Sequence, residues 1–438
     1  MKQNTTLRSK AGRLFLLATL PFCGMGILSS CNEAAKEAKS LTLYDCQGKV
    51  VLQEENDTFV QRPDTTCTEN GTYLDLSIFN YSLEKMAGLE EVHLTIDQEL
   101  QDTTNRVLLE KMGEIDVDWG TVILMETATG DIRSMVSLRN IERDTLLPLG
   151  NLAMEHRFAL GSTFKVASML VAMEDGKVTP ETMVDTGNGL YMMHGAVMKD
   201  WSYGGKGGFG VISVKEVLEQ SSNIGVARLI DENYGREPEQ FLSGLWRAGM
   251  GRPLEIPYAR ANEPRMKKVD DETWSETSLP WISIGYESLL TPMQICVFYN
   301  GIANQGRMVR PRLVTSTKKG DEVEEFQAAT IVDSMASLEH IRQMQDMLEN
   351  VVSAPSGTGK KAKADGFKVA GKTGTAQYRY GPSYDDAIEY FISFCGYFPA
   401  DAPKYTSFVG IKKTGLPASG GGHCGPVFKE IAECIMDR

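Results

Sequence analysis

The alternation of apolar and polar positions predicts strands towards both ends of the chain and helices between them. Strand-like runs occupy residues 92–97, 121–125, 131–136, 367–371, 390–398 and 405–411. Helical repeats occupy residues 98–112, 164–171 and 214–234, and a final helix follows Pro426. We therefore expect an α+β domain in which one antiparallel sheet recruits both ends of the chain and carries helices on both sides.

The chain divides by composition into three parts. Residues 1–31 are a basic and apolar leader, residues 32–90 are polar, and residues 91–438 hold the predicted α+β domain. Two short alternating runs in the polar part, at residues 41–45 and 49–53, predict a small head or linker that contains β structure.

The leader has the pattern of an export signal. Basic residues precede an apolar run at residues 14–20, and Leu28-Ser-Ser-Cys31 follows. This tetrapeptide resembles a bacterial lipobox, which would make Cys31 the lipidated first residue of the mature chain. The alternative is an uncleaved membrane helix over residues 14–30, a stretch at the short limit for a span. Both interpretations place the rest of the chain outside the cytoplasm, anchored to a membrane.

Export also makes disulfides chemically feasible. Cys46 and Cys67 flank a polar segment of the head, and they are the pair that we expect if one forms. Cys296, Cys395 and Cys434 lie in apolar runs that predict buried thiols.

Length and charge narrow the class of the protein. With 438 residues, 42% of them hydrophobic, the chain can bury a sizeable core. Its net charge of −13 argues against a nucleic-acid partner, and its basic clusters are short enough to be solvated surface.

Candidate chemistry begins at Ser162 and Lys165, three positions apart where a loop is predicted to enter a buried helix. Residues at that spacing share a helix face, so the hydroxyl and the amine can meet. The helix dipole would favour an alkoxide on Ser162 and lower the pKa of Lys165. The same S-x-x-K pattern starts at Ser82 and Ser316, so it does not identify a site by itself.

Two later motifs give Ser162 its context. Ser221 and Asn223 interrupt the predicted helix at residues 214–234, where they either face a cleft or cap the segment that follows. The run Lys372-Thr373-Gly374-Thr375 follows a predicted strand edge. Its lysine supplies charge, its threonines supply hydrogen-bond donors, and its glycine lets a ligand lie against the backbone. This combination suits recognition of a carboxylate.

The ordered triple S-x-x-K, S-x-N and K-T-G resembles that of the active-serine penicillin-recognising enzymes. From about residue 91 onwards, the chain is similar to the class B penicillin-binding proteins, which are peptidoglycan D,D-transpeptidases. The similar runs outside the triple are Leu94-Thr-Ile-Asp97, Leu290-Thr-Pro-Met-Gln294, Gly357-Thr-Gly359, Phe398-Pro-Ala400 and residues 302–306 and 426–431. The resemblance implies the penicillin-binding and serine β-lactamase-like transpeptidase fold, with an antiparallel sheet between helices.

The resemblance also implies a role for each residue. Ser162 would attack the D-Ala-D-Ala bond of a peptidoglycan stem peptide, Lys165 would take its proton, and Ser221 would relay that proton to the departing D-alanine. Asn223 would hold the donor peptide and Lys372 would raise the local potential. The terminal carboxylate would be bound by Thr373, Gly374 and Thr375. β-Lactams would acylate Ser162, a cell-wall synthesis complex is an expected partner, and neither a cofactor nor a metal is implied.

Other functions would use the same residues. A D,D-carboxypeptidase or a β-lactamase would send the acyl group to water, whereas a β-lactam sensor or division-complex scaffold would be acylated without turnover. The chain also departs from the class B pattern, in which a large pedestal precedes the catalytic domain; here about sixty residues do so. The glycine-rich residues 203–209 are expected to form a mobile loop that overhangs the cleft.

Overall fold

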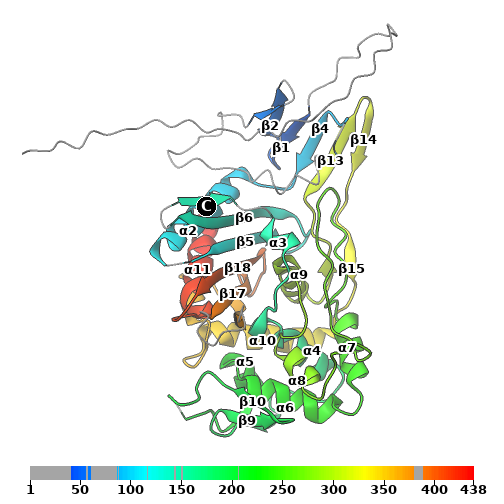
Figure 1. Ribbon diagram of the computed structural model, residues 1–438. Helices are drawn as coiled ribbons and strands as arrows, with labels where there is room; N and C mark the ends of the chain where they lie inside the picture. Colours follow the sequence, from blue (N-terminus) through cyan, green and yellow to red (C-terminus); the bar gives the residue numbers. More distant parts are fainter. Residues whose placement is uncertain are drawn as a thin grey trace, which may run out of the picture. The chain divides into compact units, whose positions relative to one another are not determined.

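The central sheet of the computed structural model has six antiparallel strands in the order β16-β17-β18-β5-β6-β7 (Figure 1). The strands are β5 (Trp119–Glu126), β6 (Ile132–Glu142), β7 (Thr145–Pro148), β16 (Ala370–Tyr378), β17 (Glu389–Phe398) and β18 (Tyr405–Thr414). Early strands thus pair with late ones through β5 and β18. The sequence-based prediction of an α+β fold whose sheet recruits both ends of the chain is confirmed.

The structure describes residues 41–55, 58–60, 86, 88–115, 117–142, 145–148, 151–205, 207–378 and 388–438. The predictions about the leader, Cys31 and Cys67 lie outside these residues. Within the described ranges, no helix is both long and apolar enough to cross a bilayer.

Helices pack on both faces of the central sheet (Figure 1). One face carries α2 (Gln98–Glu114) and α11 (Gly425–Met436), which enclose one hydrophobic core. The other carries α9 (Pro292–Ala303), and α10 (Leu338–Ser353) packs beside the edge strand β16. Local sequence sets these helices: the Asp97 carboxylate caps α2, and a capping box at Thr291 precedes the proline that starts α9.

A mainly helical layer lies beyond α10 and contains α4 (Lys165–Glu174), a helix buried along nearly its whole length. The remaining helical elements of the described residues, in this layer and elsewhere, are α3 (Leu152–Glu155), η2 (Gly161–Thr163), α5 (Val214–Glu219), α6 (Asn223–Tyr234), α7 (Pro238–Arg247), α8 (Ser278–Ser283), η3 (Lys360–Ala362) and the π-helix η4 (Gly420–Cys424). The short strands are β8 (Met183–Asp185), β9 (Leu190–Met193), β10 (Ala196–Lys199), β11 (Val211–Ser213), β12 (Met308–Val309) and β15 (Thr330–Val332).

A second sheet combines the polar head with later parts of the chain, in the order β14-β13-β4-β1-β2-β3. Its strands are β1 (Thr42–Tyr44), β2 (Val50–Glu55), β3 (Thr58–Val60), β4 (Glu91–Leu94), β13 (Val314–Lys319) and β14 (Glu322–Glu325). The head is therefore hydrogen-bonded through β1 to β4, which begins the part of the chain that starts at residue 91. The domain boundary at that residue stays a prediction.

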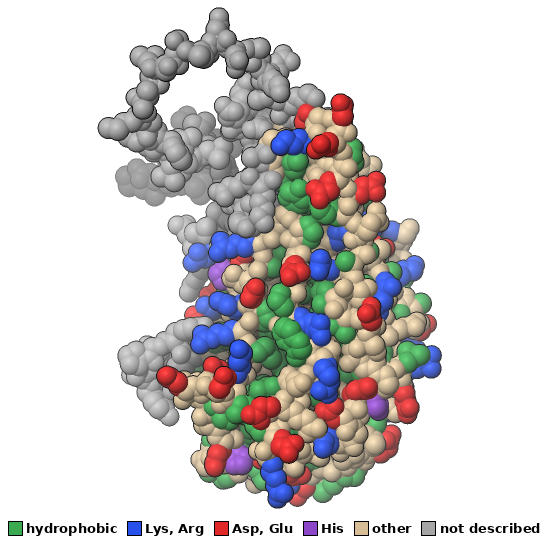
Figure 2. All heavy atoms as spheres, turned by 90° about the vertical axis from the view of Figure 1, so that its right-hand side faces the viewer, with side chains coloured by type: hydrophobic (Ala, Val, Ile, Leu, Met, Phe, Trp, Pro, Cys, Tyr) green, Lys and Arg blue, Asp and Glu red, His purple; other side chains and the backbone are tan. Residues whose placement is uncertain are grey.

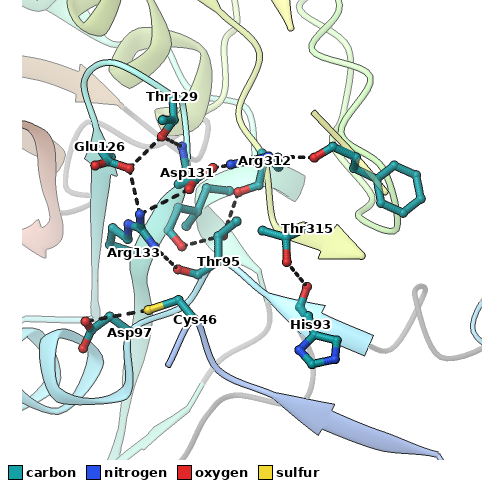
Figure 3. Close-up of polar contacts among 12 residues, drawn as sticks. Cys46, His93, Thr95, Asp97, Glu126, Thr129, Asp131, Arg133, Arg312 and Thr315 are labelled. Atoms are coloured by element: carbon teal, nitrogen blue, oxygen red, sulfur yellow. Dashed lines mark hydrogen bonds and ion pairs between the residues drawn. The ribbon is translucent and has the colours of Figure 1, made fainter. Parts of the chain in front are cut away.

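A polar network joins this second sheet to the central one (Figure 3). The Thr95 hydroxyl lies 2.8 Å from the carbonyl oxygens of residues 132 and 312. The Arg312 Nε donates to the Asp131 carboxylate at 2.6 Å, and Arg133 lies 3.3 Å from the same carboxylate. Asp131 is only 4% exposed, so this ion pair is part of the interior. It fixes the start of β6 to the segment that leads into β13.

The cysteines follow the prediction in part. Cys296 and Cys395 are buried thiols, as expected, but Cys434 is only partly buried, and its sulfur lies 3.7 Å from the Arg106 guanidinium. Cys46 is exposed and forms no disulfide within the described part of the chain. The expected Cys46–Cys67 pair stays a prediction.

Acidic and basic side chains are interspersed on the face shown in Figure 2, with apolar side chains between them. The acidic side chains at the top of this view belong to the end of the molecule that carries β13 and β14.

Candidate active site

Ser162 lies in η2, the single turn before α4, and Lys165 is the first residue of α4. Two glycines allow this turn to lie close to the edge strand β16, because neither position has room for a side chain. Gly161 has a φ of +57°, and a Cβ there would lie 2.7 Å from the Thr375 carbonyl oxygen. A Cβ on Gly374 would clash with the Ser393 hydroxyl and lie 3.0 Å from the Leu160 carbonyl oxygen. Glycine is thus required where η2 and β16 meet.

The Lys165 ammonium bridges the S-x-N segment. Its Nζ donates to the Ser221 carbonyl oxygen at 2.7 Å and to the Asn223 Oδ1 at 2.7 Å, and it lies 3.4 Å from the Ser221 hydroxyl. No hydrogen bond to Ser162 is formed among the described residues. The Lys165 amine makes its hydrogen bonds to residues 221 and 223, and its expected contact with the Ser162 hydroxyl stays a prediction.

The Lys372 ammonium contacts the same serine. Its Nζ donates to the Ser221 hydroxyl at 2.8 Å and lies 3.3 Å from the Thr373 hydroxyl. Thr373 in turn donates to the Thr358 hydroxyl at 3.0 Å. The structure therefore brings three distant motifs to one hydroxyl, that of Ser221.

Burial controls the protonation of both lysines. Lys165 and Lys372 are fully buried, and removal from water disfavours the charged form of an amine. Burial lowers the pKa of Lys165 from 10.5 to about 7, while the Asp200 carboxylate opposes this shift. Burial, followed by repulsion from Lys165, lowers the pKa of Lys372 well below its ordinary value. The lowered pKa of Lys165 was expected from the helix dipole, but its largest cause in the structure is burial.

Asp200 organises the S-x-N segment and was missed in the sequence. Its carboxylate accepts hydrogen bonds from the Ser222 hydroxyl at 2.7 Å and from the backbone N–H groups of Asn223 at 2.6 Å and Ile224 at 3.1 Å. It thus satisfies donors at the start of α6, where a negative charge is also favoured by the helix dipole. No local motif pairs residue 200 with residue 222, so only the fold could reveal this contact.

Ser221 has a φ of +58°, a left-handed conformation that costs energy for a residue with a side chain. Two sets of contacts hold it there. Its neighbour Ser222 is bound to Asp200, and its own carbonyl and hydroxyl accept from Lys165 and Lys372. Of the two sequence alternatives, the cleft-facing one applies, because Ser221 and Asn223 line a cleft; the cap of α6 is formed instead by Ser222, whose hydroxyl accepts from the Gly225 N–H.

A cleft of about 840 Å³ lies over these groups. Ser162, Ser221, Asn223, Thr373 and Thr375 all line it. Lys165 and Lys372 lie buried beside it and reach it through Ser221. Gly374 is buried against the η2 segment, so a direct contact of Gly374 with a ligand stays a prediction.

The walls of the cleft come from segments without a recognised motif. Trp201 and Phe209 flank the glycine-rich loop and pack edge to face, with ring centroids 5.8 Å apart. The loop therefore borders the cleft; that it is mobile and overhangs the cleft stays a prediction. On another side lie residues 418–421, which lead into η4, and a Cβ on Gly421 would clash with the Thr358 carbonyl oxygen. Among the described residues, no cluster of His, Cys, Asp or Glu could hold a metal ion.

The sequence matches the family model described as the penicillin binding protein transpeptidase domain over residues 120–433, which is more than half of the chain. The chain belongs to this transpeptidase domain family. The family resemblance seen in the sequence is therefore confirmed.

Two relatives of the transpeptidase domain family illustrate the similarity. The penicillin-binding protein PbpB of Mycolicibacterium smegmatis is 27% identical over 79% of this chain and 54% of its own length. The peptidoglycan D,D-transpeptidase FtsI of Escherichia coli K12 is 26% identical over 78% of this chain and 55% of its own length. The chain thus spans about half the length of the curated relatives it matches.

A solved structure shows the same fold. Penicillin-binding protein 3 of Mycobacterium tuberculosis, crystallised as a complex with aztreonam, matches with a TM-score of 0.74 and 22% identity. The match covers 92% of this chain and 96% of that one, so it extends beyond the span of the family model.

Proposed function

We propose that this protein is a peptidoglycan D,D-transpeptidase that cross-links stem peptides through an acyl-enzyme on Ser162 and is inhibited by β-lactams. The observation that carries the proposal is the double contact of Ser221, whose hydroxyl and carbonyl meet two fully buried lysines under a cleft that Ser162 lines. Membership of the transpeptidase domain family and the names of the relatives support it.

Acylation begins at Ser162. A neutral Lys165, favoured by its lowered pKa of about 7, removes the proton from the Ser162 hydroxyl. The oxygen attacks the carbonyl carbon of the penultimate D-alanine and forms a tetrahedral oxyanion. The backbone N–H groups of Ser162 and Thr375 stabilise this oxyanion, a contribution of about 3 kcal/mol per donor to the barrier. The peptide C–N bond then breaks, and Ser221 relays the proton from Lys165 to the leaving D-alanine amine.

The remaining residues bind the donor. β16 is an edge strand of the central sheet, so the donor peptide can extend along its unpaired edge. Asn223 holds an amide of the donor, while Thr373 and Thr375 bind its terminal carboxylate beside the potential of Lys372. The negative charge of this carboxylate would stabilise the protonated form of Lys372, which is otherwise buried away from water.

Deacylation by an amine completes the cross-link. The amine nitrogen of an acceptor stem peptide bonds to the acyl carbon, the ester bond to Ser162 Oγ breaks, and a proton of the amine passes through Lys165 to Ser162. Because stem peptides lie outside the cytoplasm, the proposal places the enzyme there, attached to the membrane by lipid on Cys31 or by an uncleaved leader. A cell-wall synthesis complex would be its partner.

The proposal is tested by measuring whether the acyl group is transferred to an amine or to water. Purified protein is incubated with a stem-peptide thioester and an amine acceptor, and the amide and acid products are quantified. We expect the amide to predominate and Ser162→Ala to abolish both products. Release of the acid alone would indicate a carboxypeptidase or β-lactamase, and a stable acyl-enzyme without either product would indicate a sensor or scaffold.

A further inference from the structure

A second groove lies beside the cleft. It has a volume of about 400 Å³, and Lys360 lines both hollows. Four more lysines line this groove, from α2, from η3 and the residue after it, and from α11. They are Lys111, Lys361, Lys363 and Lys429. These lysines line what we call the lysine groove together with Lys360, Pro426 and two acidic residues, Glu430 and Glu433.

The lysine groove has a surplus of positive charge. Lys429 pairs with Asp365 at 3.2 Å and Glu433 at 3.5 Å, and Lys111 pairs with Glu114 at 3.2 Å. Lys361 and Lys363 are exposed, and neither takes part in an ion pair between described residues. Lys360 is also exposed, and its ammonium donates only to the Pro355 carbonyl oxygen at 2.6 Å. These three lysines, close in sequence, are thus available to an anion.

The lysine groove adjoins the cleft at Lys360, close in sequence to Thr358, which also lines the cleft. Thr373, a proposed ligand of the terminal carboxylate, donates to the Thr358 hydroxyl at 3.0 Å. From Thr358 the chain runs two residues to Lys360 and on through η3, which packs on α11. The lysine groove is therefore next to the place where the departing D-alanine would be held.

We propose that the lysine groove binds carboxylates of the acceptor stem peptide. The inference rests on the proposed transpeptidase function, because it concerns the second substrate of that reaction. The acceptor amine has to reach the acyl carbon from the side that the leaving D-alanine vacates, which is the Thr373 side. A stem peptide carries free carboxylates along its length. Positive charge beside its path would attract and orient it, an effect that is weakened by salt.

Charge reversal of the two lysines outside the cleft tests the proposal. Lys361→Glu/Lys363→Glu is compared with Lys319→Glu/Lys404→Glu, which makes the same change of charge at exposed lysines elsewhere. Two acceptor peptides are used that differ only in carrying free or amidated carboxylates, with the same thioester donor. For the free-carboxylate acceptor, we expect kcat/KM to fall about three- to tenfold in the groove variant. The loss should shrink in 0.5 M salt, and the amidated acceptor should react as with the wild type.

Several results would overturn the inference. An equal loss for both acceptors, an equal loss in the control variant, or no loss at all would each do so. Loss of binding to phosphatidylglycerol vesicles with unchanged acceptor kinetics would assign the groove to a membrane surface instead. Acylation by benzylpenicillin, measured on every variant, separates the two proposals: failure of the wild type to acylate contradicts the transpeptidase function, whereas normal acylation without acceptor discrimination contradicts only the groove.

Discussion

The rate of acylation should follow the protonation of Lys165. Its pKa is lowered from 10.5 to about 7 by burial, a difference worth about 5 kcal/mol at about 1.4 kcal/mol per unit. At neutral pH about half of the amine is therefore neutral, roughly a thousandfold more than in an ordinary lysine. If the neutral amine is the base, the acylation rate rises with pH through about 7 and then levels off.

Stopped-flow acylation with a fluorescent penicillin measures this profile. We expect the rate constant to rise nearly tenfold from about pH 5 to 6 and to reach a plateau above about pH 8. Lys165→Arg should abolish acylation at every pH because a guanidinium stays protonated. Lys177→Arg, at an exposed lysine, is the matched control and should keep the profile. A flat profile over this range, or a midpoint near 10, would refute the reasoning.

The same shift affects stability. The folded protein holds Lys165 with a depressed pKa, so the unfolded chain binds more protons between about pH 7 and 10.5. This group therefore adds stability as the pH rises through that window, and its unfavourable contribution is fully present below it. Denaturant unfolding of the wild type and of Lys165→Met at pH 6 and 9 would reveal the difference: the substitution should stabilise more at pH 6.

Three further substitutions test the framework of the site. Asp200→Asn removes a buried carboxylate that accepts three hydrogen bonds; we expect a loss of about 2 kcal/mol in unfolding free energy and a midpoint of acylation at lower pH, measured by urea unfolding and stopped flow. Gly161→Ala places a methyl group 2.7 Å from the Thr375 carbonyl oxygen at a φ of +57°, so penicillin acylation should fall at least tenfold, whereas Gly176→Ala, with open space, should acylate normally. Asp131→Ala leaves the Arg312 guanidinium without its buried partner. It should lower the unfolding free energy by about 3 kcal/mol while the folded fraction still acylates, and an unchanged melting curve would show that the ion pair is dispensable.

Local patterns in the sequence were enough to predict the α+β class, the strands near residues 121–125 and 131–136, and five residues that line the cleft: Ser162, Ser221, Asn223, Thr373 and Thr375. These features depend on the period of hydrophobic positions, on turn residues and on short motifs, each of which is recognised within a few residues. The break between α5 and α6 fell at the predicted serine and asparagine for the same reason.

Features that depend on distant contacts could not be predicted in this way. Asp200 meets the start of α6 only because β10 and α6 are packed together. The lowered pKa of Lys165 depends on complete burial, which periodicity does not measure. Gly374 was interpreted as space for a ligand, which stays a prediction; in the fold its missing side chain also makes room for the Ser393 hydroxyl and the Leu160 carbonyl oxygen. The lysine groove likewise combines α2, η3 and α11, three segments that are far apart in the chain.

The most direct test of the central claim is mass spectrometry of the intact protein after incubation with benzylpenicillin, followed by peptide mapping. We predict a long-lived adduct of one penicilloyl group, located on Ser162 and missing in Ser162→Ala. No adduct, an adduct on another residue, or rapid release of hydrolysed penicillin would contradict a transpeptidase that acylates at this serine.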